Sequence, residues 1–239
     1  AELNGKAQSL QEELQSLEGA GDALTKLAAQ RARCLQDYDA AARALSKSRA
    51  AAAKKLGASV SALMAELGMA GGSFAVELEP QPAGEPDAQG RERCEFTVSA
   101  NPGMPLRPLR RVASGGELSR IGLAIEVAAL GADAIGTMVF DEVDAGIGGA
   151  VAETVGIKLR ALGARRQVLC VTHLPQVAAQ GHAQVHVAKS SDAGATRTRV
   201  ALLDAQGRRE ELARMLGGVE VGREARAHAK RMLEKAQAS

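Results

Sequence analysis

The chain has 239 residues, 46% of them apolar, and a formal net charge of +2 at pH 7. This length and apolar content allow a substantial core in one or two domains. The near-neutral charge gives no global attraction to nucleic acid, and an aromatic content of 2% leaves almost nothing for stacking unpaired bases.

A seven-residue repeat of apolar side chains runs through residues 1–70. One position of the repeat holds Leu3, Leu10, Leu17, Leu24, Tyr38, Leu45 and Ala52, and the other holds Ala7, Leu14, Ala28, Leu35, Ala42, Leu56 and Leu63. Only Gly21, Arg31, Arg49 and Ser59 break the pattern between residues 3 and 63. Such a repeat predicts a coiled-coil helix that needs a partner. The alternative is an ordinary surface helix packed on its own domain.

Glycines are expected to divide this helical segment. The sequence Gly-Ala-Gly-Asp at 19–22 predicts an interruption, because Asp22 is a good N-cap for a fresh helix. Residues 1–18 are then a separate helix, a candidate for the tail of an opposite coil leg. The long helix is expected to end near Gly68, and Gly71 and Gly72 stop it.

Beyond residue 70 the pattern changes to alternation. Residues 73–79 and 93–99 alternate like β-strands, and residues 81–90, rich in Pro, Gly and Asp, predict a flexible turn. A helix is expected over 117–130. Its predicted buried side consists of Leu118, Ile121, Leu123, Ile125 and Val127.

A strand, a helix and a second strand are expected next, over residues 135–140, 151–162 and 167–171. Both strands are apolar enough to be buried, and this spacing predicts a parallel α/β unit. Residues 183–189 and 196–203 alternate on either side of a Gly-containing turn, which predicts a β-hairpin. Two helices, at 210–216 and 222–236, complete a chain of the α/β class.

The sequence Ser114-Gly115-Gly116-Glu117 precedes the 117–130 helix. Two glycines let the backbone approach a ligand closely, and the free N–H groups of a helix start favour an anion. Ser114 and Glu117 also have the spacing of a capping box, which needs no ligand. Both roles are compatible, since a cap fixes the turn that presents the amides.

Asp141 and Glu142 follow the apolar strand at its carboxyl end, the edge at which open α/β sheets bind ligands. One carboxylate could hold the water shell of Mg²⁺ and the other could orient an attacking water. A pair of solvated acids is the alternative. Asp144 extends the loop, and the glycines at 146, 148 and 149 suit a close approach by another backbone.

His173 follows the next strand, with Pro175 placed for the first turn of a helix. An imidazole there could contact a terminal phosphate, although a lone histidine is usually hydrogen-bonded within its own turn. Parallel strands would bring His173 to the same sheet edge as Asp141.

Basic side chains recur at helical spacing near the end of the chain: Arg223, Arg226, Lys230 and Arg231. They could contact DNA phosphates. Because Glu224 and Glu234 dilute them, the favoured interpretation is a solvated face.

These motifs together resemble the SMC-like ABC-type ATPases of bacterial DNA repair. Residues 109–120 resemble the ABC signature, 139–149 a Walker B motif with its D-loop, and 171–177 the switch histidine loop. The sequences at 144–149 and 211–218 narrow the likeness to the repair proteins rather than other SMC heads. The resemblance covers roughly residues 22–235.

A phosphate loop of the form G-x-x-x-x-G-K-[ST] is absent from the 239 residues. In the family it lies before the coiled coil. The resemblance therefore implies a C-terminal half: a coil segment over 1–70 and the C-terminal lobe of an ABC-type ATPase head over 71–239. The start at Ala1, without an initiator Met, suits an excised fragment.

The resemblance also implies roles for individual residues. Two heads would enclose two ATP molecules, with Ser114, Gly115, Gly116 and Glu117 forming the motif that contacts the nucleotide of the opposite head, Ser114 and Gly116 at its γ-phosphate. Asp141 would bind Mg²⁺ through water, Glu142 would act as general base, and His173 would sense the γ-phosphate. Asp144 belongs to the D-loop and joins the nucleotide-binding set.

The implied partners are the N-terminal phosphate-loop half of the same protein, a second copy engaged through ATP, and DNA at double-strand break ends. A structural coiled-coil tether without turnover is the alternative from another class. An ATPase subunit of a transporter is disfavoured by the coil and by the D-loop sequence.

The cysteines Cys34, Cys94 and Cys170 are odd in number, far apart and without C-x-x-C spacing. They argue against a zinc site and against a disulfide framework, and so for a reducing, cytoplasmic compartment; the resemblance adds association with the nucleoid. Glu126 and Asp133 interrupt the most apolar stretch, 121–140, so no membrane span is expected.

Overall fold

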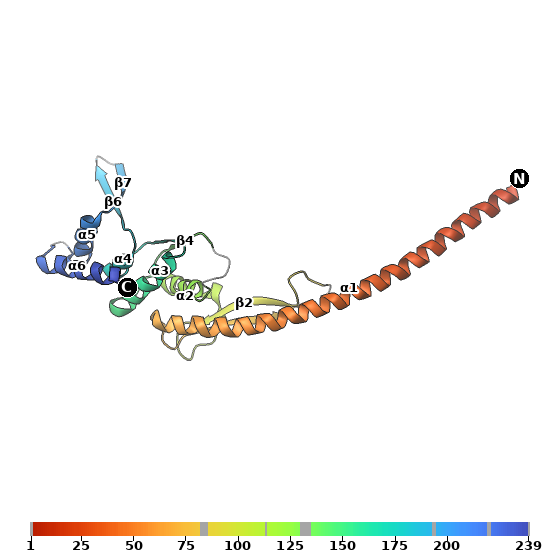
Figure 1. Cartoon of the computed structure of the whole chain (residues 1–239), viewed down its shortest axis with the longest axis horizontal. Helices are drawn as coiled ribbons and strands as arrows, with labels where there is room; N and C mark the ends of the chain where they lie inside the picture. The colour runs from red at the N-terminus through yellow and green to blue at the C-terminus, as the bar shows by residue number, and fades with distance from the viewer. Residues whose placement is uncertain are drawn as a thin grey trace. The chain divides into compact units, whose positions relative to one another are not determined.

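The computed structural model describes residues 2–81, 86–112, 114–129, 135–192, 195–218 and 221–238 (Figure 1). The chain divides into two compact units, residues 1–52 with 78–94, and residues 53–77 with 95–239. No helix in the described ranges has the length and hydropathy needed to cross a membrane.

The first unit contains most of helix α1 (Glu2–Glu66), the long red-to-orange helix of Figure 1. The segment that follows β1 (Ser73–Pro80) and precedes β2 (Glu92–Ser99) is fastened to this helix. Arg49 donates to the carbonyl of Gln89 (2.7 Å), and the amide of Asp87 donates to the Tyr38 hydroxyl (3.3 Å). Of the predicted flexible turn 81–90, residues 82–85 lie outside the described part of the chain.

The predicted break at Gly19–Asp22 is wrong, because α1 passes through it without interruption. A glycine inside a helix costs about 1 kcal/mol relative to alanine, which lowers stability but does not end the helix. Thr25 shows the continuous ladder, since its hydroxyl donates to the carbonyl of Gly21 (3.0 Å).

The predicted end near Gly68 is confirmed. Gly68 has φ +85, and the amides of Gly68 and Met69 donate back to the carbonyls of Ala65 (3.4 Å) and Met64 (2.9 Å). This is the hydrogen-bond pattern of a Schellman motif, which requires the left-handed conformation that glycine adopts without cost.

The second unit is built around a parallel α/β unit, as predicted. Helix α2 (Gly115–Ala128) leads to β4 (Thr137–Phe140), and α3 (Gly149–Gly163) connects β4 to β5 (Gln167–Cys170). The two strands pair in parallel from Thr137 opposite Gln167 to Phe140 opposite Cys170. Leu130, the end of the predicted 117–130 helix, is outside the described residues.

The core of this unit gathers buried apolar side chains from α1, the sheets, α2, α3 and α4: Val60, Met64, Leu67, Phe74, Ile121, Leu123, Met138, Phe140, Val143, Val155, Leu159, Leu162 and Val177. Strands β1, β2 and a short β3 (Arg107–Pro108) form a separate sheet in that order, and β3 was not expected from the sequence. The rings of Phe74 and Phe96 meet there at 5.3 Å.

Two expectations about burial are wrong. On α2 the expectation fails at Leu118, which is 42% exposed, whereas Ile121 and Leu123 are buried as predicted; the inward face follows residues 116, 120, 121, 123 and 124. Strands β4 and β5 are covered on one face only, so that Met138 is 8% exposed but Val139, Leu169 and Val171 are 66%, 52% and 60% exposed. Side chains alternate across a strand, and within the described part of the chain the second face is left exposed.

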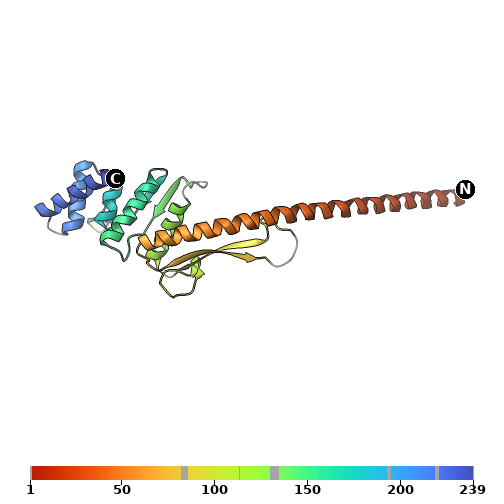
Figure 2. The ribbon, with the colours of Figure 1, turned by 60° about the horizontal axis from the view of Figure 1, so that its bottom comes forward.

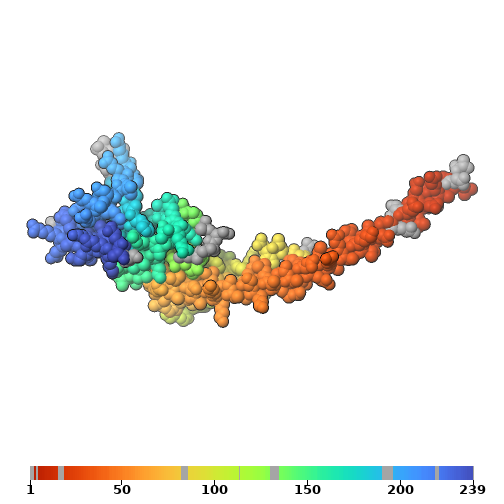
Figure 3. All heavy atoms as spheres, in the orientation of Figure 1, coloured from red at the N-terminus to blue at the C-terminus, as the bar shows by residue number. Residues whose placement is uncertain are grey.

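The C-terminal region consists of α4 (Pro175–Gln180), a hairpin and two helices. Strands β6 (Val185–Asp192) and β7 (Ala195–Leu202) pair antiparallel, as predicted, and stand out from the helices in Figure 3. Helices α5 (Ala205–Gly217) and α6 (Arg223–Ala238) lie side by side in Figure 2 and pack with α4 around Leu212 and Leu233. Helix α5 begins earlier than predicted because Asp204 caps it, accepting from the amide of Gly207 (2.6 Å).

Candidate functional site

The Ser114–Glu117 turn forms the N-terminus of α2. Ser114 is the N-cap, and its hydroxyl accepts a hydrogen bond from the amide of Glu117 (3.3 Å). The predicted capping role of Ser114 is therefore present. The turn is exposed at Ser114 and Gly115 and leaves its first amides available to an anion.

The two glycines of this turn allow the loop after β4 to lie against it. A Cβ atom on Gly115 would stand 2.5 Å from Oε2 of Glu142, and one on Gly116 would stand 3.0 Å from the Cβ of Ala145. At Gly116 the neighbours are the Cβ and backbone of Ala145, which leave little room for a side chain, whereas at Gly115 the neighbour is the end of a flexible side chain that can move. The packing brings the Gly115 backbone to the carboxylate of Glu142.

Two further α2 residues hold the same loop, and sequence reasoning missed both. The Ser119 hydroxyl donates to the backbone carbonyl of Asp141 (2.7 Å). The guanidinium of Arg120 donates to the backbone carbonyls of Ala145 (2.8 Å) and Val143 (3.4 Å). Arg120 is only 6% exposed, and burial lowers its pKa, with Glu117 acting in the opposite direction. Arg120 could have been found from the sequence, because its helical spacing places a charged residue on the otherwise apolar buried face of α2.

Asp141 and Glu142 follow β4 directly and are both exposed. Asp141 accepts from the amide of Glu142 (2.9 Å). Glu142 has φ +55, and it is the one non-glycine residue with a positive φ among those that the structure describes. This conformation costs about 1–2 kcal/mol and often occurs at functional positions.

Asp144 and His173 are joined directly. Asp144 is 2% exposed, and its Oδ2 accepts from the hydroxyl of Thr172 (2.5 Å) and from the amide of His173 (3.1 Å). The Nδ1 atom of His173 lies 3.3 Å from the same oxygen, while the His173 side chain is 71% exposed. The predicted sharing of one sheet edge by Asp141 and His173 is confirmed by the parallel pairing of β4 with β5.

Cys170, at the end of β5, is no nucleophile. Burial raises the pKa of its thiol to about 12, and the nearby carboxylates of Asp144 and Asp141 act in the same direction. The thiol is neutral at physiological pH, and only a thiolate reacts readily.

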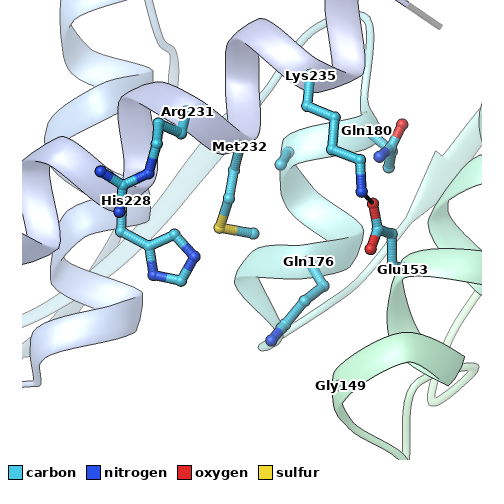
Figure 4. A pocket seen from close by; sticks show the side chains of 9 residues that line it. Gly149, Glu153, Gln176, Gln180, His228, Arg231, Met232 and Lys235 are labelled. Carbon is cyan, nitrogen blue, oxygen red and sulfur yellow. Dashed lines mark hydrogen bonds and ion pairs between the residues drawn. The ribbon is translucent and has the colours of Figure 1, made fainter.

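The glycines at 146, 148 and 149 face open space: a Cβ atom at any of them would meet nothing within 4 Å. A cavity of about 350 Å³ begins at Gly149 and is lined mainly by α4 and α6 (Figure 4). Lys235 reaches across it to Glu153 (2.5 Å). None of the signature, β4 or His173 side chains lines this cavity.

The basic residues of α6 are partly neutralised. Arg226 pairs with Glu210 (2.9 Å) and Lys230 with Glu234 (3.7 Å), whereas Arg231 lines the cavity. This distribution agrees with the favoured interpretation of a solvated face, because exposed ion pairs of this kind are common and weak.

The chain is similar in sequence to proteins named DNA repair protein RecN. It is 56% identical to that of Xylella fastidiosa (strain Temecula1) over 197 residues and 43% identical to that of Vibrio cholerae over 232 residues. These matches cover 82% and 97% of this chain.

The chain belongs to the RecN family.

It spans 35% and 42% of the length of these two relatives, and 42% of the RecN of Bacillus subtilis, with which it is 35% identical. No family model matches the chain. Among solved structures, the Smc head domain with a coiled coil and joint from Pyrococcus yayanosii aligns with 77% of this chain and 29% of that one, at 21% identity and a TM-score of 0.48. The Smc head domain with an extended coiled coil from Pyrococcus furiosus aligns with 70% of this chain and 38% of that one, at 20% identity and a TM-score of 0.45.

Proposed function

We propose that this chain forms part of an ATP-hydrolysing RecN head that acts in the repair of DNA double-strand breaks. The observation that carries the proposal is the gathering of the α2 turn, the β4 acids and His173 around one sheet edge. Glu142 lies against Gly115, and Asp144 joins the loops that follow β4 and β5. The relatives' name supports DNA repair as the process.

The nucleotide cradle comes from a further segment, because the sequence has no phosphate loop. The exposed faces of two sheets support such a segment. Val139 and Leu169 are exposed on β4 and β5, and Val187 (57%) and Val200 (64%) are paired on one face of the hairpin. Paired apolar side chains left in water are a typical sign of a missing cover.

The carboxylates after β4 divide the chemistry between them. Asp141, an exposed oxygen ligand, fits Mg²⁺, which usually takes one or two carboxylates together with water and phosphate oxygens. Bound Mg²⁺ supplies charge neutralisation on the phosphates. Glu142 takes the proton of the attacking water as general base, and His173 contacts the terminal phosphate.

The α2 turn acts on the nucleotide of a second copy. Ser114 and Gly116 contact its γ-phosphate, and Gly115 and Glu117 complete the motif, so ATP closes a homodimer and hydrolysis opens it. Residues 1–70 serve as the coil segment, and residues 71–239 as the lobe of the head. DNA ends are the substrate on which the closed dimer acts, in the nucleoid of the cytoplasm.

A structural tether without turnover is the second candidate. The exposed leucines of α1 favour it, since Leu3 is 87% exposed and Leu24 is 68% exposed along the predicted coil seam. Such a seam suits helix pairing whether or not ATP is hydrolysed.

We call the chain joined with a phosphate-loop segment the completed head. Its ATP turnover distinguishes the ATPase from the structural tether. The completed head should hydrolyse ATP, and DNA should alter the rate. Glu142→Gln should keep nucleotide binding but stop hydrolysis, because an amide cannot accept the proton. An ATP-stabilised dimer of this variant should elute early in size-exclusion chromatography. Wild-type turnover by Glu142→Gln would remove Glu142 from the role of base.

A further inference from the structure

Asp144, which the resemblance places in the nucleotide-binding set, is a buried acid with no role in the steps proposed for ATP hydrolysis. Its carboxylate is 2% exposed, although the rest of its loop carries the exposed residues Asp141 and Glu142. A carboxylate is costly to bury unless hydrogen bonds compensate for the lost water. The partners of Asp144 therefore indicate what it does.

The donors to Asp144 among the described residues, Thr172 and His173, are consecutive and belong to another loop. Oδ2 accepts from the Thr172 hydroxyl (2.5 Å) and from the His173 amide (3.1 Å), and it faces Nδ1 of His173 at 3.3 Å. Thr172 is itself fixed, since its Oγ1 accepts from the amide of Leu174 (3.0 Å). The carboxylate thus ties the loop after β4 to the loop after β5.

The Nδ1 atom of His173 lies 3.3 Å from this carboxylate, and a carboxylate oxygen that accepts from an imidazole favours a proton on the ring nitrogen nearest to it. Which ring nitrogen of a histidine is protonated is set by the hydrogen bond that the other makes or receives. The His173 side chain is 71% exposed, and Nδ1 is turned to Asp144. Nε2 is then the atom left to meet a ligand.

We propose that Asp144 is a positioning residue that holds His173 in its Nδ1–H form with Nε2 directed away from the protein. This inference deepens the proposed function and rests on it only in the identity of the group that Nε2 meets. Neutral His173 then offers a lone pair at Nε2, and a phosphate oxygen is met by an Nε2–H donor only when both nitrogens carry protons. In acyl-transfer enzymes, a carboxylate that accepts from Nδ1–H of the catalytic histidine sets the orientation and the tautomer of the ring in the same way.

The experiment that tests the proposal measures the tautomer of His173 by NMR. It uses the ¹⁵N chemical shifts and two-bond ¹⁵N–¹H couplings of the histidine rings in the 239-residue chain without nucleotide. His173→Gln assigns the signal. At a pH where the rings are neutral, His173 should be mainly Nδ1–H, whereas a free histidine prefers Nε2–H. A wild-type His173 that is mainly Nε2–H overturns the proposal without any variant.

Asp144→Asn keeps the shape of the side chain but offers an N–H₂ donor to Nδ1, so the Nε2–H form should become the major one. Thr172→Val removes the hydroxyl that fixes the position of the Asp144 carboxylate and should give a mixture of the two His173 tautomers. Thr172→Ser keeps a hydroxyl and should show the wild-type spectrum. The rings of His182 and His228 serve as internal controls. An Nδ1–H majority that survives Asp144→Asn in a normally melting chain contradicts the role of the carboxylate.

A kinetic readout in the completed head separates this inference from the proposed function. Asp144→Asn should lower kcat about tenfold or more while leaving the KM for ATP unchanged, because the ring of His173 loses the carboxylate that holds its orientation even though Nε2 gains a proton. If the tautomer changes as expected but the completed head never hydrolyses ATP, the positioning role stands and the proposed ATPase function falls.

Discussion

At the level of single residues, contacts within the chain account for much of the motif at 114–117. Ser114 caps α2, and the glycines give room to Glu142 and Ala145. The same residues are proposed to meet a nucleotide. Structural and functional demands therefore coincide, and variants must be chosen to separate them.

Gly115→Ala places a methyl group on the carboxylate of Glu142. The carboxylate is the end of a flexible side chain and can move, so the free energy of unfolding should fall by less than about 1 kcal/mol. Turnover of the completed head should fall at least about tenfold, because the displaced Glu142 no longer orients water. Urea unfolding and ATPase assays measure the two effects.

Gly122→Ala is the matched control in the same helix, where a Cβ atom meets nothing within 4 Å. It should stabilise the chain by about 0.5–1 kcal/mol and leave turnover unchanged. Normal hydrolysis by Gly115→Ala would show that Glu142 works from another position.

Ser114→Arg tests the action of the turn on a second copy. It should leave nucleotide binding by the completed head intact and abolish dimer-dependent turnover, because a long side chain fills the place of the phosphate. Loss of the cap itself costs only about 1 kcal/mol. Thermal melting, nucleotide binding and size-exclusion chromatography distinguish a folding defect from an engagement defect.

Asp204→Ala supplies the comparison, since it removes the N-cap of α5 far from the motif in sequence. It should cost a similar free energy of unfolding and leave dimerisation alone. If Ser114→Arg dimerises and hydrolyses ATP normally, Ser114 is a helix cap and nothing more.

At the level of elements, α1 combines two kinds of helix. Its C-terminal part contributes Val60 and Met64 to the core with no exposure, whereas Leu10, Leu14 and Leu27 are 58%, 56% and 60% exposed. Helices gain most of their stability from packing of one face. The N-terminal part therefore lacks the contacts that hold the C-terminal part.

Hydrogen exchange should resolve this difference. Amides of residues 5–35 should exchange close to the rate of an unfolded peptide in the dilute chain, and those of residues 56–66 should be protected with the core. Protection of residues 5–35 that increases with protein concentration would indicate pairing between copies. Protection that is strong at all concentrations would contradict the need for a partner.

At the level of the whole molecule, the chain should hydrolyse no ATP by itself. Nothing in its sequence provides the Gly-rich backbone and lysine that cradle the β- and γ-phosphates. A sensitive phosphate-release assay on the pure 239-residue chain measures this. Steady turnover that survives Glu142→Gln would contradict both the assignment of the base and the need for a further segment.

The α/β unit, the hairpin and the helix end at Gly68 could be predicted from the sequence, because they depend on local periodicity and on single turn residues. Parallel pairing of β4 and β5 then brought Asp141 and His173 to one edge without further information. The candidate site residues could be proposed from the sequence for the same reason, since each follows a strand or precedes a helix, and their roles stay predictions.

Which faces are covered, and which side chains contact one another, became known from the three-dimensional packing. Leu118 and Val139 are apolar yet exposed, because burial depends on what packs opposite, and no periodicity records that. Helix α1 continues through Gly19 and Gly21 because two glycines cost it only about 1 kcal/mol each, which does not end a helix. The contacts of Arg120 with the 143–145 loop and of Asp144 with His173 join segments more than twenty residues apart. Such contacts arise from three-dimensional packing, to which a sequence read along its length gives no direct access.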